Sequence, residues 1–108
     1  MNLTELFKKY DFHDSYVDYF QYDLFNRAVK CCFILCDHQQ ISKCEIEFIN
    51  VNKFYIEADN SVFCENELKS SVVSSSKGEH FKCYLDEGFG KPGKAIEIGC
   101  EYIKYDLF

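Results

Sequence analysis

The polar segment Asp11-Phe12-His13-Asp14-Ser15 holds the side chains best suited to chemistry. His13 could act as a general base, with Asp11 or Asp14 orienting it and Ser15 as the nucleophile. Adjacent side chains on an extended segment point apart, however, so a triad in so short a segment does not converge. A structural turn also fits, because these Asp and Ser side chains can bond backbone groups at a helix end and a strand start. We therefore predict no catalytic residue and keep His13, Asp14 and Ser15 as binding candidates.

A metal site is the second chemistry that the sequence offers. Cys36, His38 and Cys44, joined by His80, have the right donor atoms. Zinc sites favour Cys pairs about two to four residues apart, and this spacing lacks that form. We therefore predict no metal and no cofactor.

The cysteines are expected to be reduced thiols in the interior. Their number, seven, is odd, and the N-terminal residues do not read as a secretory signal. Free cysteine behaves as a small buried hydrophobe. Those that fall in predicted strands are Cys32, Cys36, Cys44, Cys83 and Cys100.

Any such residues must be positioned by one short helix and a set of strands. Residues 3–10 have apolar side chains at helical spacing, and Asn2 with Glu5 predicts a capping box at the start. The remaining segments alternate with a period of two, which is typical of strands. The expected strands are residues 16–24, 28–37, 43–49, 54–57, 68–74, 80–86 and 94–105. Residues 62–77 read either as a flexible loop or as a loop with a polar edge strand over residues 68–74, and the edge strand is favoured because Gly78 fits the turn that follows.

Details of the pattern give further expectations. Phe25-Asn26-Arg27 reads as a turn, in which Asn26 would tolerate a left-handed backbone. Val17, Tyr19 and Gln21 are expected on one face of their strand. Gly78 suits a hairpin turn, and the alternation of the last strand slips near Cys100.

These elements predict a mainly β domain over residues 1–108. No segment reads as a crossover helix, so parallel strand pairing is not expected. The chain should form an antiparallel meander of six or seven strands, as a curled sheet, a sandwich or a partial barrel, with the N-terminal helix covering an edge or open end.

Composition narrows the class of partner. The chain has 12 basic and 18 acidic residues, a net charge of −6, and no basic stripe, which argues against nucleic-acid binding. No apolar run has the length of a membrane span, so we expect a cytoplasmic protein. Eleven Phe and eight Tyr are more rings than so small a sheet can bury. Tyr is frequent at interaction hot spots, so Tyr16 and Tyr19 join the binding candidates.

The order of a short amphipathic helix, then Phe12-His13-Asp14-Ser15, then a Tyr- and Val-rich hairpin resembles a group of small bacterial proteins. Their chains begin with a Phe/Leu-His-Asp-Ser/Ala element, and some resemble immunity protein 50. The motif covers the first 35 or so residues, and the rest matches only in strand rhythm. The resemblance implies a small, mostly β cytoplasmic protein without catalytic activity, and it identifies no ligand.

Three functional hypotheses remain open at this stage. The leading one is a non-enzymatic interaction domain, in the immunity-like case one that binds a toxin domain. The second is a small-ligand-binding protein or enzyme with a pocket near His13 and Asp14. The third is a structural homodimer formed through an open sheet edge such as the final strand.

Overall fold

The computed structural model contains one helix and eight strands in its described part, which comprises residues 1–10, 12, 16–37, 40–56, 68–85 and 95–108. The elements are α1 (Leu3–Lys9), β1 (Tyr16–Asp23), β2 (Ala28–Asp37), β3 (Gln40–Ile49), β4 (Lys53–Ile56), β5 (Leu68–Ser75), β6 (Gly78–Leu85), β7 (Ala95–Cys100) and β8 (Tyr102–Leu107). The expectations for Asp11, residues 13–15 and residues 86–94 lie outside the described residues.

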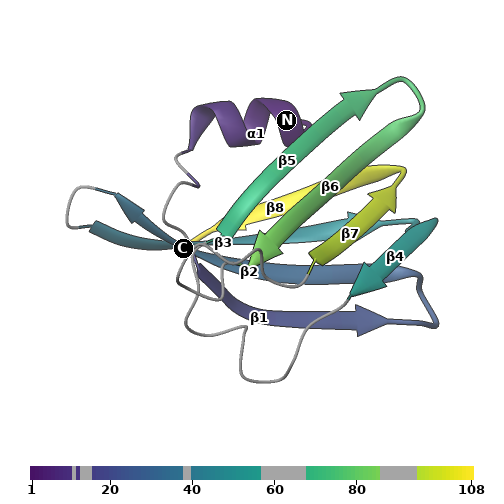
Figure 1. Cartoon of the computed structure of the whole chain (residues 1–108), viewed down its shortest axis with the longest axis horizontal. Helices are drawn as coiled ribbons and strands as arrows, with labels where there is room; N and C mark the ends of the chain where they lie inside the picture. The colour runs from purple at the N-terminus through teal and green to yellow at the C-terminus, as the bar shows by residue number, and fades with distance from the viewer. Residues whose placement is uncertain (11, 13–15, 38–39, 57–67, 86–94) are drawn as a thin grey trace.

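The strands form two four-stranded sheets in which every neighbouring pair is antiparallel. The first sheet, sheet A, has the order β1-β2-β3-β8, and the second, sheet B, has the order β4-β7-β6-β5. The sheets lie in two layers and do not close into a barrel, and Figure 1 shows sheet B crossing sheet A obliquely. The mainly β, antiparallel prediction is confirmed, and of its three forms the chain adopts two packed sheets.

The prediction of a single last strand over residues 94–105 is wrong, and the described residues hold eight strands where six or seven were expected. β7 belongs to sheet B and β8 to sheet A, and Glu101 lies between them. The slip in alternation near Cys100 marks this change of sheet. The β3–β4 connection makes the same change, and the two are tied by bonds from Glu101 N to Ile49 O (3.1 Å) and from Asn50 Nδ2 to Glu101 Oε2 (2.9 Å).

The prediction that Val17 and Tyr19 lie on the same face of β1 is wrong. A register shift between Val17 and Tyr19 places an irregularity at Asp18. Val17 is consequently buried on the inner face, whereas Tyr19 lies on the outer face. A strict period of two could not anticipate this bulge.

The core lies between the sheets and is built around aromatic rings. Phe33 and Phe48 of sheet A meet Phe81 of sheet B at centroid distances of 5.8 and 5.7 Å, and all three are fully buried. Four buried thiols belong to this core, those of Cys31, Cys44, Cys83 and Cys100, while Cys32 is buried on the outer face of sheet A. The prediction of interior thiols is confirmed for Cys44, Cys83 and Cys100, and the side chain of Cys36 lies outside the described part. Burial is the main cause of the raised pKa values of the buried thiols, which reach about 12 for Cys44, Cys83 and Cys100.

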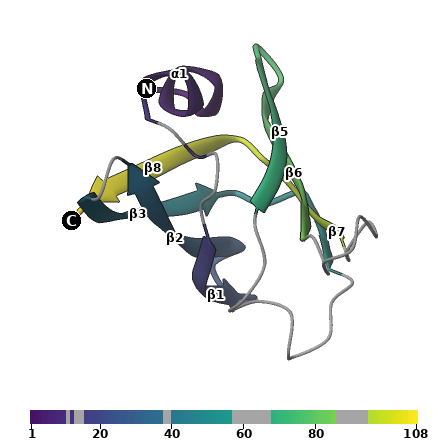
Figure 2. The ribbon, with the colours of Figure 1, turned by 60° about the vertical axis from the view of Figure 1, so that its left-hand side comes forward.

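Helix α1 covers one open side of the two layers. It lies beside β5 and over the β8 side of sheet A in both views (Figures 1 and 2), and Leu3 and Leu6 are fully buried. The predicted capping box of Asn2 and Glu5 is present. Ser74 of β5 holds the helix start, because its hydroxyl accepts from Thr4 N (3.1 Å) and Thr4 Oγ1 (3.0 Å) and donates to the Glu79 carboxylate.

Aromatic contacts close the opposite side, where the edge strands β1 and β4 approach each other. The Phe54 ring lies 5.6 Å from Phe20 and 4.5 Å from Tyr22, measured between centroids. No helix in the described residues is long and apolar enough to cross a membrane.

Candidate interaction surface at the first hairpin

The sequence-predicted binding residues are only partly placed by the structure. His13, Asp14 and Ser15 lie outside the described residues, and Tyr16 is placed only as the first residue of β1. Tyr19 is on the outer face of sheet A, where its side chain is 41% exposed. The structure therefore describes the surroundings of Tyr19 alone among the five candidates.

Tyr19 forms part of a cover over Cys32. Register places Tyr19, Cys32 and Glu45 side by side on β1, β2 and β3, and the Tyr19 hydroxyl donates to the Glu45 carboxylate across the middle strand. An ion pair of 3.1 Å from Lys43 Nζ to Asp18 Oδ2 makes a second crossing. The Cys32 residue is only 2% exposed although it lies on the outer face.

This cover keeps Cys32 protonated. Its pKa is raised, first because burial penalises the thiolate and then because Asp18 is nearby, while Lys43 acts in the opposite direction. A thiol is a poor nucleophile in its protonated form. The side chains of Tyr19, Glu45, Asp18 and Lys43 thus form a polar layer over this thiol. Because its pKa is raised, these neighbours do not activate the thiol as a nucleophile.

The turn between β1 and β2 is held by a carboxylate. Asp23 accepts hydrogen bonds from Asn26 N (3.2 Å) and Asn26 Nδ2 (2.7 Å), and these bonds lower its pKa. The turn expected at residues 25–27 is present, and its left-handed residue is Arg27, with φ 50°. Asn26 is instead engaged by Asp23, and the Arg27 carbonyl accepts from Val51 N (2.8 Å).

Two large apolar side chains stand on this fixed turn. Leu24 is 76% exposed and Phe25 is 94% exposed, the latter the most exposed of the large hydrophobic residues described. The turn was predictable from its residues, whereas neither side chain was among the predicted binding residues. A signal was present, since turn positions normally carry Gly, Asn, Asp, Ser or Pro.

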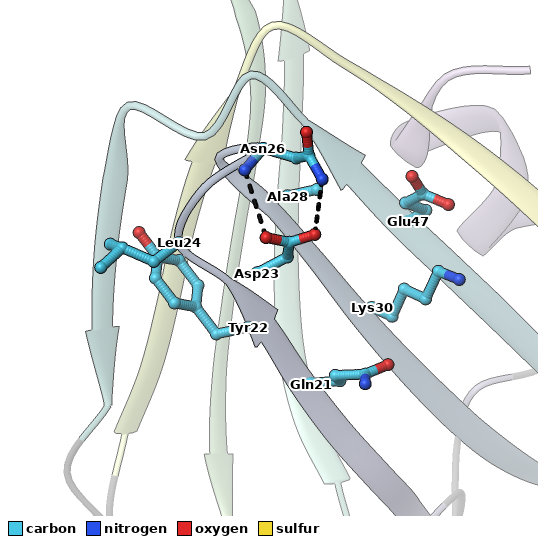
Figure 3. Close-up of a pocket in the computed structure, with 8 residues that line it drawn as sticks. All are labelled: Gln21, Tyr22, Asp23, Leu24, Asn26, Ala28, Lys30 and Glu47. Atoms are coloured by element: carbon cyan, nitrogen blue, oxygen red, sulfur yellow. Dashed lines mark hydrogen bonds between the residues drawn. The ribbon is translucent and has the colours of Figure 1, made fainter.

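A hollow of about 580 Å³ lies beside the same turn. Its lining residues are Gln21, Tyr22, Asp23, Leu24, Asn26, Ala28, Lys30 and Glu47 (Figure 3). Lys30 and Glu47 are register partners on β2 and β3, and neither forms an ion pair within the described residues. We call Leu24, Phe25 and this hollow together the hairpin surface.

Neither a search for metal-binding groups nor a comparison with known proteins indicates a further functional site in the described residues. Within the described part of the chain, no group of three or more His, Cys, Asp or Glu residues is placed to hold a metal ion. The chain matches no protein-family model, no curated protein and no solved structure.

Proposed function

We propose that this chain is a non-enzymatic protein-interaction domain and that the hairpin surface contacts its partner. The observation that carries the proposal is Phe25, 94% exposed on a turn that Asp23 and Asn26 hold in place. A fixed turn leaves its backbone little conformational freedom to lose on binding, and such preorganisation favours affinity.

The apolar part of the surface is large enough to matter energetically. Complete burial of a Leu or Phe side chain contributes about 1.5–3 kcal/mol. Leu24 and Phe25 together would therefore contribute about 3–6 kcal/mol to a complex that covered them. The hollow beside them offers a carboxylate, an ammonium group and amides, which would supply orientation and specificity.

The proposed partner is a protein with a basic surface. The chain carries a net charge of −6, which would speed its encounter with a positively charged partner. The resemblance to immunity-type proteins supports a toxin domain as that partner, sequestered in the cytoplasm. In this role the chain binds and covers the partner and performs no chemistry.

The test is a quantitative capture experiment in the native host. The bait is the full chain, compared with the double variant Leu24→Ser/Phe25→Ser and with the control Phe108→Ser. Phe108 is 70% exposed but lies at the other end of the chain, so the control matches the loss of an exposed ring. We expect a specific partner whose recovery falls at least tenfold with the double variant and is unchanged with the control.

Two results would contradict the proposal. One is the absence of any protein recovered specifically by the unaltered chain. The other is equal recovery by the unaltered chain and by the double variant, once circular dichroism shows that both are folded.

One observation favours a second candidate function, small-ligand binding. The hollow of about 580 Å³ lies within the range typical of ligand sites, roughly 300–1,000 Å³. Its place at the first hairpin differs from the expected pocket near His13 and Asp14, which lies outside the described residues. A ligand found in a metabolite screen would have to shift the amide signals of Gln21 and Lys30, and unmoved signals would exclude this site.

A further inference from the structure

The outer face of sheet B gathers basic groups in an acidic protein. Register aligns Lys53 of β4, Gly99 of β7 and His80 of β6 in one row across this face. Lys82 and Glu97 are partners in the next row. Lys77 stands in the turn between β5 and β6. The chain as a whole carries a net charge of −6, whereas basic residues outnumber acidic ones in this group.

A hollow of about 200 Å³ lies within this grouping. Gly99 is one of its lining residues, and we call it the Gly99 hollow. A Cβ atom at Gly99 would come within 2.8 Å of Asn52 Oδ1 and 3.1 Å of Lys53 Cβ, so the absence of a side chain lets these two residues pack against the β7 backbone. The lining residues are Asn52, Lys53, Val73, Ser75, Lys77, Gly78, Glu79, His80, Gly99 and Cys100.

One carboxylate of the chain, that of Glu97, already contacts two basic residues that line the hollow. Glu97 Oε1 lies 2.5 Å from Lys53 Nζ and 3.7 Å from His80 Nε2. The pKa of Glu97 is lowered, first by the hydrogen bond from Lys53 and then by the charges of Lys53, His80 and Lys82, while burial acts against these. The other carboxylate nearby, Glu79, is turned to the inner face, where Ser74 donates to it.

We propose that the Gly99 hollow binds a small oxyanion, with a phosphate group as the preferred ligand and Lys77 and His80 as its main cationic contacts. Lys53 is already shared with Glu97, whereas the Lys77 ammonium group has no ion pair among the described residues. The Lys77 ammonium group and the His80 ring would each contact a phosphate oxygen. This site is separate from the hairpin surface, so the proposal does not depend on the proposed function.

The walls of the hollow add to the charge argument. Val73, 58% exposed, stands on β5 next to His80 in register and offers an apolar contact to the carbon part of an organic phosphate. Asn52 and Ser75 add polar side chains to the lining. Charge-assisted hydrogen bonds to such donors are roughly twice as strong as neutral ones.

The test is an NMR titration of the full chain with inorganic phosphate, with sodium chloride adjusted so that ionic strength stays constant. Screening by salt is then equal at every point. We expect saturable shifts of the Gly78 and Gly99 amide signals. The double variant Lys77→Gln/His80→Gln should bind about tenfold more weakly or worse, because it loses two charge-assisted contacts. The control Lys104→Gln removes a lysine from sheet A and should bind as the unaltered chain does.

A parallel titration with acetate distinguishes the sources of the oxyanion. Weaker binding of acetate than of phosphate supports a phosphate ligand, and equal or tighter binding of acetate supports an oxyanion site that takes carboxylates. Shifts that chloride alone reproduces would overturn the proposal. So would phosphate affinity that the double variant retains in full while its circular dichroism spectrum remains native.

Discussion

Replacement of Phe81 by Ala would remove the side chain at which both sheets and the helix meet. The Phe81 ring is fully buried on β6. Its centroid lies 5.8 Å from Phe33 and 5.7 Å from Phe48 on sheet A, and 6.0 Å from Phe7 on α1. A methyl group at this position would reach none of these three rings.

The size of the effect follows from these contacts. Truncation of a buried Phe to Ala costs about 3–5 kcal/mol. Favourable aromatic pairs contribute about 0.5–1.5 kcal/mol each beyond the area that they bury. With three ring neighbours on three elements, Phe81 belongs at the upper end, and we expect a loss of about 5 kcal/mol. Small domains have total stabilities of about 5–15 kcal/mol, so this loss approaches the whole of a weakly stable domain.

Urea unfolding followed by circular dichroism measures the loss, provided that the slope of the free energy against urea is unchanged. The matched control is Phe25→Ala, which removes the same ring from a position 94% exposed. It should change the free energy of unfolding by no more than about 0.5 kcal/mol. If Phe81→Ala does not fold, Phe81→Leu keeps most of the volume and should cost about 1–2 kcal/mol.

Either of two results would contradict the role assigned to Phe81. The first is a loss below about 2 kcal/mol for Phe81→Ala at unchanged slope, which would mean that the inter-sheet contacts contribute little. The second is a comparable loss for Phe25→Ala, which would mean that the exposed ring of the hairpin surface is needed for folding and is not free to contact a partner.

Two further predictions concern the helix and the thiols. Ser74→Ala should cost about 1–2 kcal/mol, because Thr4 loses its acceptor and Glu79 loses a donor, and amide exchange in α1 should accelerate more than exchange in β2. Ser75→Ala is the neighbouring control, and equal exchange rates in the two variants would contradict this role. The buried thiols Cys44 and Cys83, with pKa values of about 12 against an ordinary 9.0, should not react with a disulfide reagent at pH 8 in the folded protein. These thiols ionise near pH 9.0 only in the unfolded chain, which therefore binds fewer protons than the folded chain above that pH. The free energy of unfolding should consequently fall from about pH 9 towards pH 12. A free energy of unfolding that stays constant over this range would count against the burial of the two thiols.

Local pattern was sufficient for the elements whose structure is fixed by their own residues. The capping box of Asn2 and Glu5 and the apolar spacing of α1 involve neighbours within one or two helical turns. The expected bounds of β2, residues 28–37, are those of the structure. Residues 31–36 form an unbroken apolar run, which predicts a strongly buried strand, and turn residues at 25–27 precede its start.

The same pattern could not reveal where the chain leaves one sheet for the other. Residues 94–105 read as one strand with a slip, yet Glu101 separates β7 in sheet B from β8 in sheet A. That break depends on Ile49, whose carbonyl accepts from Glu101 N, and Ile49 is remote in sequence. The bulge at Asp18 is a similar case, because its cause is the register with β2. Features decided by distant partners are the ones that single-sequence periodicity misses.

The residues of the candidate interaction surface could not be predicted from local sequence either. The sequence analysis took Tyr19 as a binding residue because Tyr is common at interfaces, but its hydroxyl is engaged with Glu45 over Cys32. Phe25 was read only as part of a turn, and exposure was not predictable from its type, since most Phe residues described here are buried or partly buried. A folded chain gains nothing in stability from a ring left in water, so a Phe at a fixed, exposed turn calls for an explanation outside the fold. Contact with a partner is the explanation proposed here, and the comparison of Phe25→Ala with Phe81→Ala separates it from a structural role.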